Sequence, residues 1–198
     1  MLRARRLSEA LRRPTPGAHD TASIAIDRAD AAAAPDSPRF ADSSRLLIAG
    51  LVERHSRADG DAAIPRQWQR FAAYLGRIPG QVGNVAYGTS YYSDGRDNID
   101  YLCGVEVSDF SSVPRNFGLL CISPQRYAVF VHHQPVSSIR ATWSAIWSKW
   151  LPDSGHEVAN APFFERYGAG FDPQTGTGGV EIWIPIVADA ISSPAPQR

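Results

Sequence analysis

An internal repeat is the feature that most restricts what this chain can fold into. When residues 68–107 are aligned without gaps against residues 143–182, nine of forty positions are identical, whereas ordinary composition gives about two or three. The identities include the pair Trp68 and Trp143 and the tripeptide Gly-Val-Glu, which begins at Gly104 and again at Gly179. We expect the two copies to pack around a pseudo-twofold axis, because each carries an apolar face that needs a partner.

Each copy contains the patterns of a strand, a helix and two further strands. Apolar residues recur at three- and four-residue spacing in both helical stretches, and Pro65 marks the predicted start of the first helix. In order, the stretches are 45–55, 64–78, 85–92 and 99–109, then 126–133, 136–151, 162–171 and 179–187. The sequence therefore predicts an α+β fold of two β-α-β-β modules related by a pseudo-twofold axis, with an antiparallel sheet, helices on one face and a ligand cleft.

Composition sets the expected limits of this domain. Residues 14–43 are dominated by Pro, Ala, Asp and Ser, and such a segment buries too little apolar surface to offset its ordering entropy. A chain of 198 residues with 43% apolar residues is long enough for one well-packed domain. We expect a disordered or weakly ordered tail at 1–44, one domain at 45–188 and a flexible tail at 189–198.

Charge and motif content exclude several classes of partner. The 20 basic and 20 acidic residues balance, so the sequence predicts no direct nucleic-acid binding. No apolar run approaches the roughly 20 residues that span a bilayer, and no secretory signal is present. We therefore expect a cytoplasmic protein with no membrane partner. Neither a zinc-like ligand spacing nor a nucleotide-binding glycine motif occurs, so no metal and no cofactor are predicted.

The two cysteines point to the same absence of a metal. Cys103 and Cys121 lie in apolar, strand-like runs with no CxxC spacing between them. We expect both to be buried, reduced thiols rather than a disulfide or a metal site.

The repeated glutamates, Glu106 and Glu181, interrupt apolar strands. Because alternate side chains of a strand point to opposite faces, both glutamates are predicted to lie on the face that their helix does not cover. One interpretation is a solvated polar face. The other is a pocket, because each glutamate shares its row with Leu102 or Trp183 and with glycine. A desolvated carboxylate of this kind can attract a lipophilic cation or act as a general acid or base.

The motifs resemble those of a known family. An ordered series of stretches, IPRQWQRFAAYLG, YLCGVEVSD, RYAVFVHH, IWSKWLPDSG, APFFERYGAGFDPQTG and VEIWIPI, is similar to the GyrI-like effector-binding domains, which have a SOUL-like duplicated fold. These domains also occur at the C-terminus of AraC-type and MerR-type transcription activators. The resemblance covers about residues 45–188 and implies a cleft between the modules, with a glutamate amid aromatic rings that holds hydrophobic, often cationic compounds.

The resemblance also implies site residues. It implies that ligand is bound by Glu106, Glu181, Trp183, Trp147, Tyr127 and Phe164. Tyr92 and Tyr101, which are aromatic residues of the first repeat, are expected to bind ligand beside them. If the protein is instead an enzyme, as some stand-alone members are for cyclopropane-bearing electrophiles, Glu181 and Tyr167 are the expected catalytic pair, with Glu106 and Tyr127 as the alternatives. Other members inhibit DNA gyrase, so gyrase or a separate regulator is a further candidate partner. The 44 residues before the domain are too few for the usual helix-turn-helix module, which predicts a stand-alone member.

Overall fold

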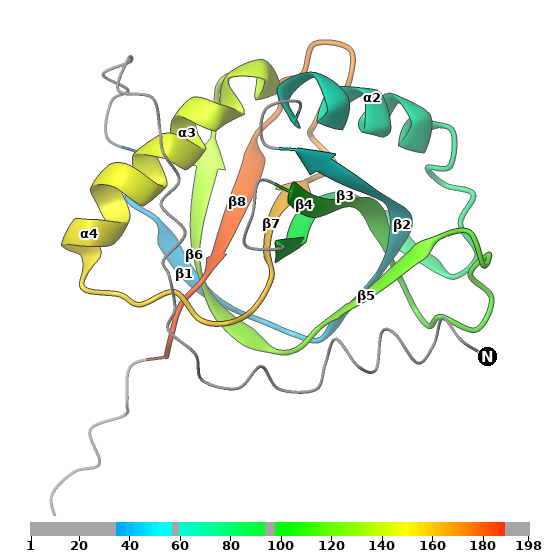
Figure 1. The fold of residues 1–198 in the computed structure, drawn as a ribbon, viewed down its shortest axis with the longest axis horizontal. Helices are drawn as coiled ribbons and strands as arrows, with labels where there is room; N and C mark the ends of the chain where they lie inside the picture. Colours follow the sequence, from blue (N-terminus) through cyan, green and yellow to red (C-terminus); the bar gives the residue numbers. More distant parts are fainter. Residues whose placement is uncertain (1–34, 57–59, 94–97, 189–198) are drawn as a thin grey trace, which may run out of the picture.

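A computed structural model describes residues 35–56, 60–93 and 98–188 of the chain. These residues form an eight-stranded antiparallel sheet that curls around its own inner face, with the helices along the outer face (Figure 1). The strands are β1 (Arg39–Ser43), β2 (Leu46–Ser56), β3 (Gln81–Ser93), β4 (Asn98–Val107), β5 (Gly118–Ile122), β6 (Gln125–His132), β7 (Phe163–Tyr167) and β8 (Val180–Pro185). The helices are α2 (Gly60–Ala72), η1 (Val136–Ser138), α3 (Ile139–Ala145), η2 (Ile146–Trp150) and α4 (Leu151–Ser154).

The predicted pair of β-α-β-β modules is confirmed. The strand order is β1-β6-β8-β7-β3-β4-β2-β5, so β2, β3 and β4 of the first module lie together, as do β6, β7 and β8 of the second. The modules join where β3 pairs with β7. This junction is the centre of the sheet, and residues that face the helices there can be reached from both modules.

Two strands, β1 and β5, were not predicted. The register of β1 on β6 runs from Arg39↔Val129 to Ser43↔Gln125, and the pairing of β2 with β5 continues it without a shift from Leu46↔Ile122. Because β1 leads into β2 and β5 leads into β6, this ladder draws the two ends of the sheet together and makes it curl. The domain therefore begins earlier than the predicted boundary at residue 45, since β1 lies within the expected tail.

The ungapped repeat is only partly a structural repeat. Val105 pairs with Ala86 and Val180 pairs with Tyr167, so Ala86 is the structural counterpart of Tyr167. The sequence alignment had matched Tyr167 with Tyr92, and that match is wrong. The reason is the different length of the second strands, because β3 has 13 residues and β7 has 5.

The helices also differ from their predicted bounds. The first helix begins at Gly60, which places Pro65 inside it rather than at its start, and it ends before Leu75 and Ile78. The second helical stretch is continuous from Ile139 to Ser154 but contains a π-helical segment, η2. Such segments are rare and are frequently found at functional sites. Among the residues that the structure describes, no helix is long and apolar enough to cross a membrane.

The predicted alternation of side chains in β4 and β8 is confirmed. Residues 101, 103, 105 and 107 of β4 pack with Phe71 of α2, and residues 182, 184 and 186 pack with Ile146 of η2. The opposite, concave face has a core of strand residues alone: Ile48, Tyr87, Leu102, Ile122, Tyr127, Val129 and Phe164. Both faces of the sheet are therefore buried, which excludes the wet-face interpretation for most of the concave side.

The two cysteines differ in their surroundings. Cys103 is buried, as predicted, but Cys121 is exposed because β5 is an end strand of the sheet. Both are free thiols.

Candidate functional site

A buried glutamate that the sequence analysis did not single out occupies the centre of the helix-facing side. Glu165 lies in the middle of β7 and is only 9% exposed. Its Oε2 atom accepts hydrogen bonds from the hydroxyls of Tyr167, at 2.7 Å, and Tyr101, at 3.2 Å. Its Oε1 atom accepts one from Nε1 of Trp143, at 2.8 Å. Three donors from β4, β7 and α3 thus converge on one carboxyl group.

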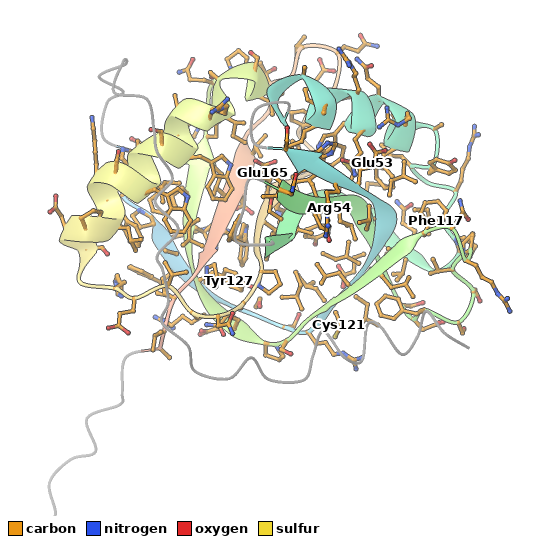
Figure 2. All side chains as sticks on the ribbon, in the orientation of Figure 1. Glu53, Arg54, Phe117, Cys121, Tyr127 and Glu165 are labelled. Carbon is orange, nitrogen blue, oxygen red and sulfur yellow. The ribbon has the colours of Figure 1, made fainter. Side chains whose placement is uncertain are left out.

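Both repeated tryptophans take part in this cluster. Trp68 of α2 donates its Nε1 hydrogen to the hydroxyl of Tyr101, at 3.2 Å, and its ring lies 4.8 Å from that of Tyr167. Trp143 of α3 bonds Glu165 directly. The duplication therefore places one indole from each module in the same cluster at the junction of the two modules: Trp143 bonds the carboxyl group directly, and Trp68 bonds Tyr101, which bonds the carboxyl group in turn. Figure 2 shows Glu165 beside the helices and Tyr127 farther from them.

A buried histidine anchors each tryptophan-bearing helix. Gln67, which precedes Trp68 and is fully buried, accepts a hydrogen bond from His55 at 2.6 Å and donates to the carbonyl of Tyr101 at 3.0 Å. Thr142, which precedes Trp143, bonds Nδ1 of His132 at 2.8 Å. These bonds join the helices to the strands beneath them, and so they fix the approach of both indoles to Glu165.

Burial controls the ionisation of this cluster. Desolvation raises the pKa of Glu165, and the hydrogen bonds from Tyr167, Trp143 and Tyr101 offset part of that rise. Desolvation, with the nearby Glu165 carboxyl, also raises the pKa values of Tyr101 and Tyr167 well above their usual range. Both phenols are therefore neutral donors at physiological pH. A buried carboxylate is stabilised when a cation is brought next to it, because the cation compensates for the hydration that the carboxylate loses on burial.

The predicted site residues are divided between the two faces of the sheet. On the helix-facing side, Tyr101 and Tyr167 bond Glu165, and Trp147 packs against Phe163 with ring centroids 6.1 Å apart. The concave side holds the other described members of the set, which are Glu106, Glu181, Trp183, Tyr127 and Phe164. The side chain of Tyr92 lies outside the described residues.

Glu181 on the concave side is ion-paired rather than isolated among rings. It bonds Arg39 at 2.6 Å and Arg166 at 3.1 Å, and Nε1 of Trp183 donates to it at 3.1 Å. Desolvation acts to raise the pKa of Glu181, but the hydrogen bonds from Arg39 and Trp183 and the charges of Arg39 and Arg166 outweigh it and lower the pKa. Glu181 is therefore a stable anion.

The two repeated glutamates share a common neighbour. Burial raises the pKa of Tyr87, and the negative charges of Glu106 and Glu181 raise it further. Both carboxylates thus act on one buried tyrosine of the concave face.

The sequence contains a signal for Glu165. In β7, residues Phe163, Glu165 and Tyr167 alternate and share one face, so a lone carboxylate sits between two aromatic residues. The repeat concealed it, because the residue 75 positions earlier is Ser90. Glu165 therefore has no acidic counterpart in the ungapped alignment.

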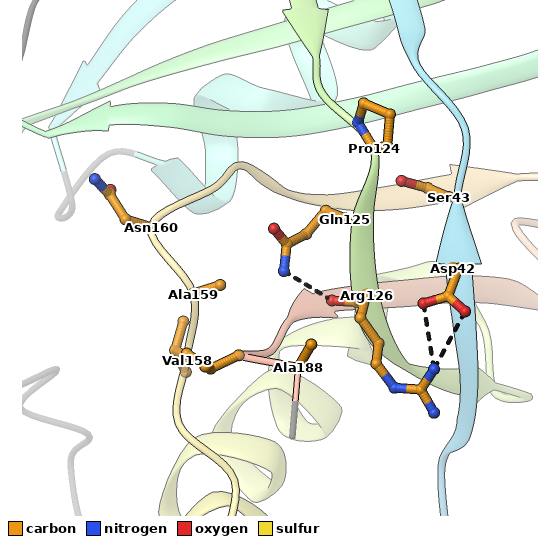
Figure 3. Close-up of a pocket in the computed structure, with 10 residues that line it drawn as sticks. Asp42, Ser43, Pro124, Gln125, Arg126, Val158, Ala159, Asn160 and Ala188 are labelled. Atoms are coloured by element: carbon orange, nitrogen blue, oxygen red, sulfur yellow. Dashed lines mark hydrogen bonds and ion pairs between the residues drawn. The ribbon is translucent and has the colours of Figure 1, made fainter. Parts of the chain in front are cut away.

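A separate surface cavity lies near the edge of the sheet that β1 and β6 form. It has a volume of about 560 Å³ and is bordered by β1, β6 and residues 158–160 (Figure 3). Its charged lining residues, Asp42 and Arg126, pair with each other at 3.2 Å. No aromatic residue lines this cavity, and none of its lining residues is among the hydrogen-bond partners of Glu165.

Comparison with known proteins gives a consistent family. Residues 37–187 match the model of the GyrI-like small molecule binding domain. The transcriptional regulator BrlR of Pseudomonas aeruginosa is 29% identical over 150 residues, which are 75% of this chain and 54% of BrlR. A DNA gyrase inhibitor of Erwinia billingiae is 33% identical over 60 residues, 30% of this chain and 38% of the inhibitor. The chain thus spans about half, or less, of the curated relatives it matches.

Solved structures share the fold at low sequence identity. SAV2435 bound to tetraphenylphosphonium has a TM-score of 0.64 and 19% identity, with 76% of this chain and 93% of that one covered. The C-terminal domain of EcmrR has a TM-score of 0.53 and 18% identity, with 75% and 96% covered.

Proposed function

The chain belongs to the GyrI-like small molecule binding domain family, and from that membership we propose that it binds lipophilic organic cations, with Glu165 as the anionic contact. The observation that carries the proposal is the buried Glu165 carboxyl, which is surrounded by four aromatic side chains from both modules: Trp68, Tyr101, Trp143 and Tyr167. Polar groups that converge within an apolar, aromatic setting are typical of small-molecule sites.

The chemistry of this cluster suits a large, soft cation. Each ring in contact with such a cation contributes about 0.5–2 kcal/mol by cation–π attraction. A charge at about 5 Å from the carboxylate, at an effective dielectric constant of about 20, adds about 3 kcal/mol. Trp68 and Trp143 are both only partly buried, so Trp143 extends from the surface to Glu165 and Trp68 extends from the surface to Tyr101. A ligand would enter between these two indoles and replace their bonds to the Glu165–Tyr101 pair.

A matched pair of glutamate variants tests the proposal. Tetraphenylphosphonium, the compound bound in the SAV2435 structure, is the probe, and triphenylphosphine oxide serves as a neutral compound of related shape. In titration calorimetry, Glu165→Gln is expected to weaken binding of the cation roughly 10- to 100-fold and to change binding of the neutral compound little. Glu181→Gln, on the other face of the sheet, is the control. Equal losses for both compounds would rule out a charge role for Glu165, and a loss seen only in the control would transfer that role to Glu181.

Hydrolysis is the second candidate function, and one geometric observation favours it. The hydroxyl of Tyr167 lies 2.7 Å from Oε2 of Glu165, which is a suitable distance for a proton donor and a base to act together. The predicted pair, Glu181 and Tyr167, is not formed: Arg166 is the residue that pairs with Glu181 across the strands, so Tyr167 faces the other way. Glu165 replaces Glu181 as the proposed general base.

The hydrolytic reaction would add one water molecule to a strained electrophile. Glu165 would take a proton from water, the water oxygen would bond to a ring carbon as the strained carbon–carbon bond breaks, and Tyr167 would give its proton to the departing ring carbon. Glu165 would then pass the proton from water to Tyr167 along their 2.7 Å hydrogen bond, which restores both groups. Mass spectrometry of a cyclopropane-bearing electrophile incubated with the protein should then show many equivalents of the hydrated product. Loss of one equivalent per protein without turnover would reject catalysis. DNA gyrase is a third candidate, ranked below hydrolysis, and a supercoiling assay is the direct measurement.

A further inference from the structure

We propose a second organic-cation site, on the concave face of the sheet, which is formed by Glu181 and Trp183 and is occupied in this structure by the side chain of Arg39. The site is separate from Glu165, which lies on the opposite face. Its ligand would be a flat aromatic cation that carries a guanidinium or amidinium group. Such a compound would compete directly with Arg39.

The contacts of Arg39 are those of a bound cation. Its Nη2 atom lies 2.6 Å from Oε1 of Glu181, and its guanidinium carbon lies 5.3 Å from the centroid of the Trp183 ring. One ion pair and one cation–π contact are thus made by the same planar group. Trp183 also bonds the other oxygen of Glu181, so the carboxylate and the indole are held as one unit.

The ring that receives the cation is rigidly supported. Trp183 stacks on Phe164 at 5.2 Å with an interplanar angle of 18°, and Tyr127 meets both rings edge-on at 5.5 Å and 5.3 Å. Phe164 is 1% exposed and Tyr127 is fully buried, whereas Trp183 is partly exposed. A ligand would therefore meet a preformed aromatic surface, and little side-chain ordering would oppose its binding.

The charges on this face leave room for one cation once Arg39 moves away. Two carboxylates, Glu106 and Glu181, act on Tyr87, and Arg166 also interacts with it. Arg39 is the second positive charge in contact with Glu181. Arg54 and Asp100, in the same rows of β2 and β4, pair with each other at 2.7 Å. With both Arg39 and Arg166 present the charges around Glu181 balance, and displacement of the Arg39 side chain leaves a net charge of minus one.

Arg39 is well placed to leave without unfolding the sheet. It is the first residue of β1, an end strand of five residues, and its side chain is 50% exposed. Exposed ion pairs contribute little to stability, so the side chain can rotate into solvent while its backbone stays paired with Val129. The site is thus open to competition by a cation that stacks on Trp183 better than a guanidinium alone.

Phenylguanidinium is the probe for this site, titrated by calorimetry into the full chain. Removal of the resident competitor in Arg39→Ala should tighten binding roughly tenfold if Arg39 occupies the site for about nine-tenths of the time. Adding Glu181→Gln to that variant should abolish the gain, and Arg39→Lys, which keeps the charge and resembles Arg in chain length, should bind close to wild type.

Controls separate this site from the Glu165 site. The gain in phenylguanidinium affinity caused by Arg39→Ala should be the same with Glu or Gln at position 165, so failure of tetraphenylphosphonium binding and failure of the second site are independent outcomes. The inference is overturned if Arg39→Ala, shown to be folded by its thermal transition, binds phenylguanidinium no better than wild type. It is also overturned if the gain persists after Glu181→Gln.

Discussion

A single methyl group added at Gly88, in the strand next to Glu165, should destabilise the Glu165 cluster. Gly88 lies in β3 and pairs with Cys103 of β4 and Glu165 of β7. A Cβ atom there would lie 2.1 Å from the hydroxyl oxygen of Tyr101 and 3.1 Å from Oε2 of Glu165. Tyr101 is 4% exposed, so its ring cannot move aside into solvent.

The magnitude follows from two costs. Overpacking a filled core costs about 1–3 kcal/mol. Displacing the Tyr101 hydroxyl also breaks its bonds with Trp68 and Glu165, both 3.2 Å long, and a hydrogen bond to a charged group is worth about 1.5–3 kcal/mol. We expect Gly88→Ala to lower the free energy of unfolding by about 3–5 kcal/mol, allowing for partial relaxation.

Urea unfolding followed by tryptophan fluorescence measures this change. The matched control is Gly168→Ala, just after β7, where the nearest atom that the added methyl group meets is Nη1 of Arg166 at 3.8 Å. That variant should be within about 0.5 kcal/mol of wild type. If Gly88→Ala proved as stable as Gly168→Ala, the close packing of Tyr101 against β3 would be wrong, and with it the account of how the cluster is held.

Three further predictions concern the core and the buried charge. Burial raises the pKa of Glu165 above its ordinary value of 4.5, so the unfolded chain releases this proton first and the free energy of unfolding should fall as pH rises from about 4.5 through the raised pKa. In Glu165→Gln that part of the pH profile should be flat, and an unchanged slope would contradict the assignment. Phe164→Ala should cost about 3–5 kcal/mol in chemical denaturation, while Phe40→Ala, at a residue 44% exposed, should cost under about 1 kcal/mol. Gln67→Leu should cost about 1–3 kcal/mol, because it leaves buried polar partners unbonded, and the exposed Gln69→Leu is its control; similar melting temperatures for the two would show that the buried amide is not needed.

Local patterns within the sequence were sufficient to predict the two β-α-β-β modules. Strand alternation and helical spacing depend on neighbouring residues alone, so the order of strand, helix and two strands, and the inward rows of β4 and β8, could be predicted. The Gly-Val-Glu tripeptide, which begins at Gly104 and again at Gly179, also identified β4 and β8 as equivalent strands. Helix ends and the β3–β7 equivalence were less predictable, because Pro65 is tolerated inside α2 and because the strands differ in length.

The site depended on information that no local pattern contains. Sequence reasoning identified Tyr101 and Tyr167 but combined them with Glu181, since the repeat drew attention to that glutamate. The alternation of β8 had placed Glu181 on the face away from the helix, but only the pairing of β7 with both β3 and β8 brings Glu165 to the junction of the two modules, on the side that faces the helices.

The sequence by itself therefore determined the two modules and the inward rows of β4 and β8, because these follow from periodicity over a few residues. The tertiary structure decided which residues from distant strands and helices meet. Tyr101 and Trp143 meet at Glu165, and Trp68 joins them through Tyr101, only because the sheet joins the modules at β3 and β7. Arg39 reaches Glu181 only because β1 pairs with β6, a contact between segments 90 positions apart at Arg39↔Val129, which composition had assigned to a disordered tail.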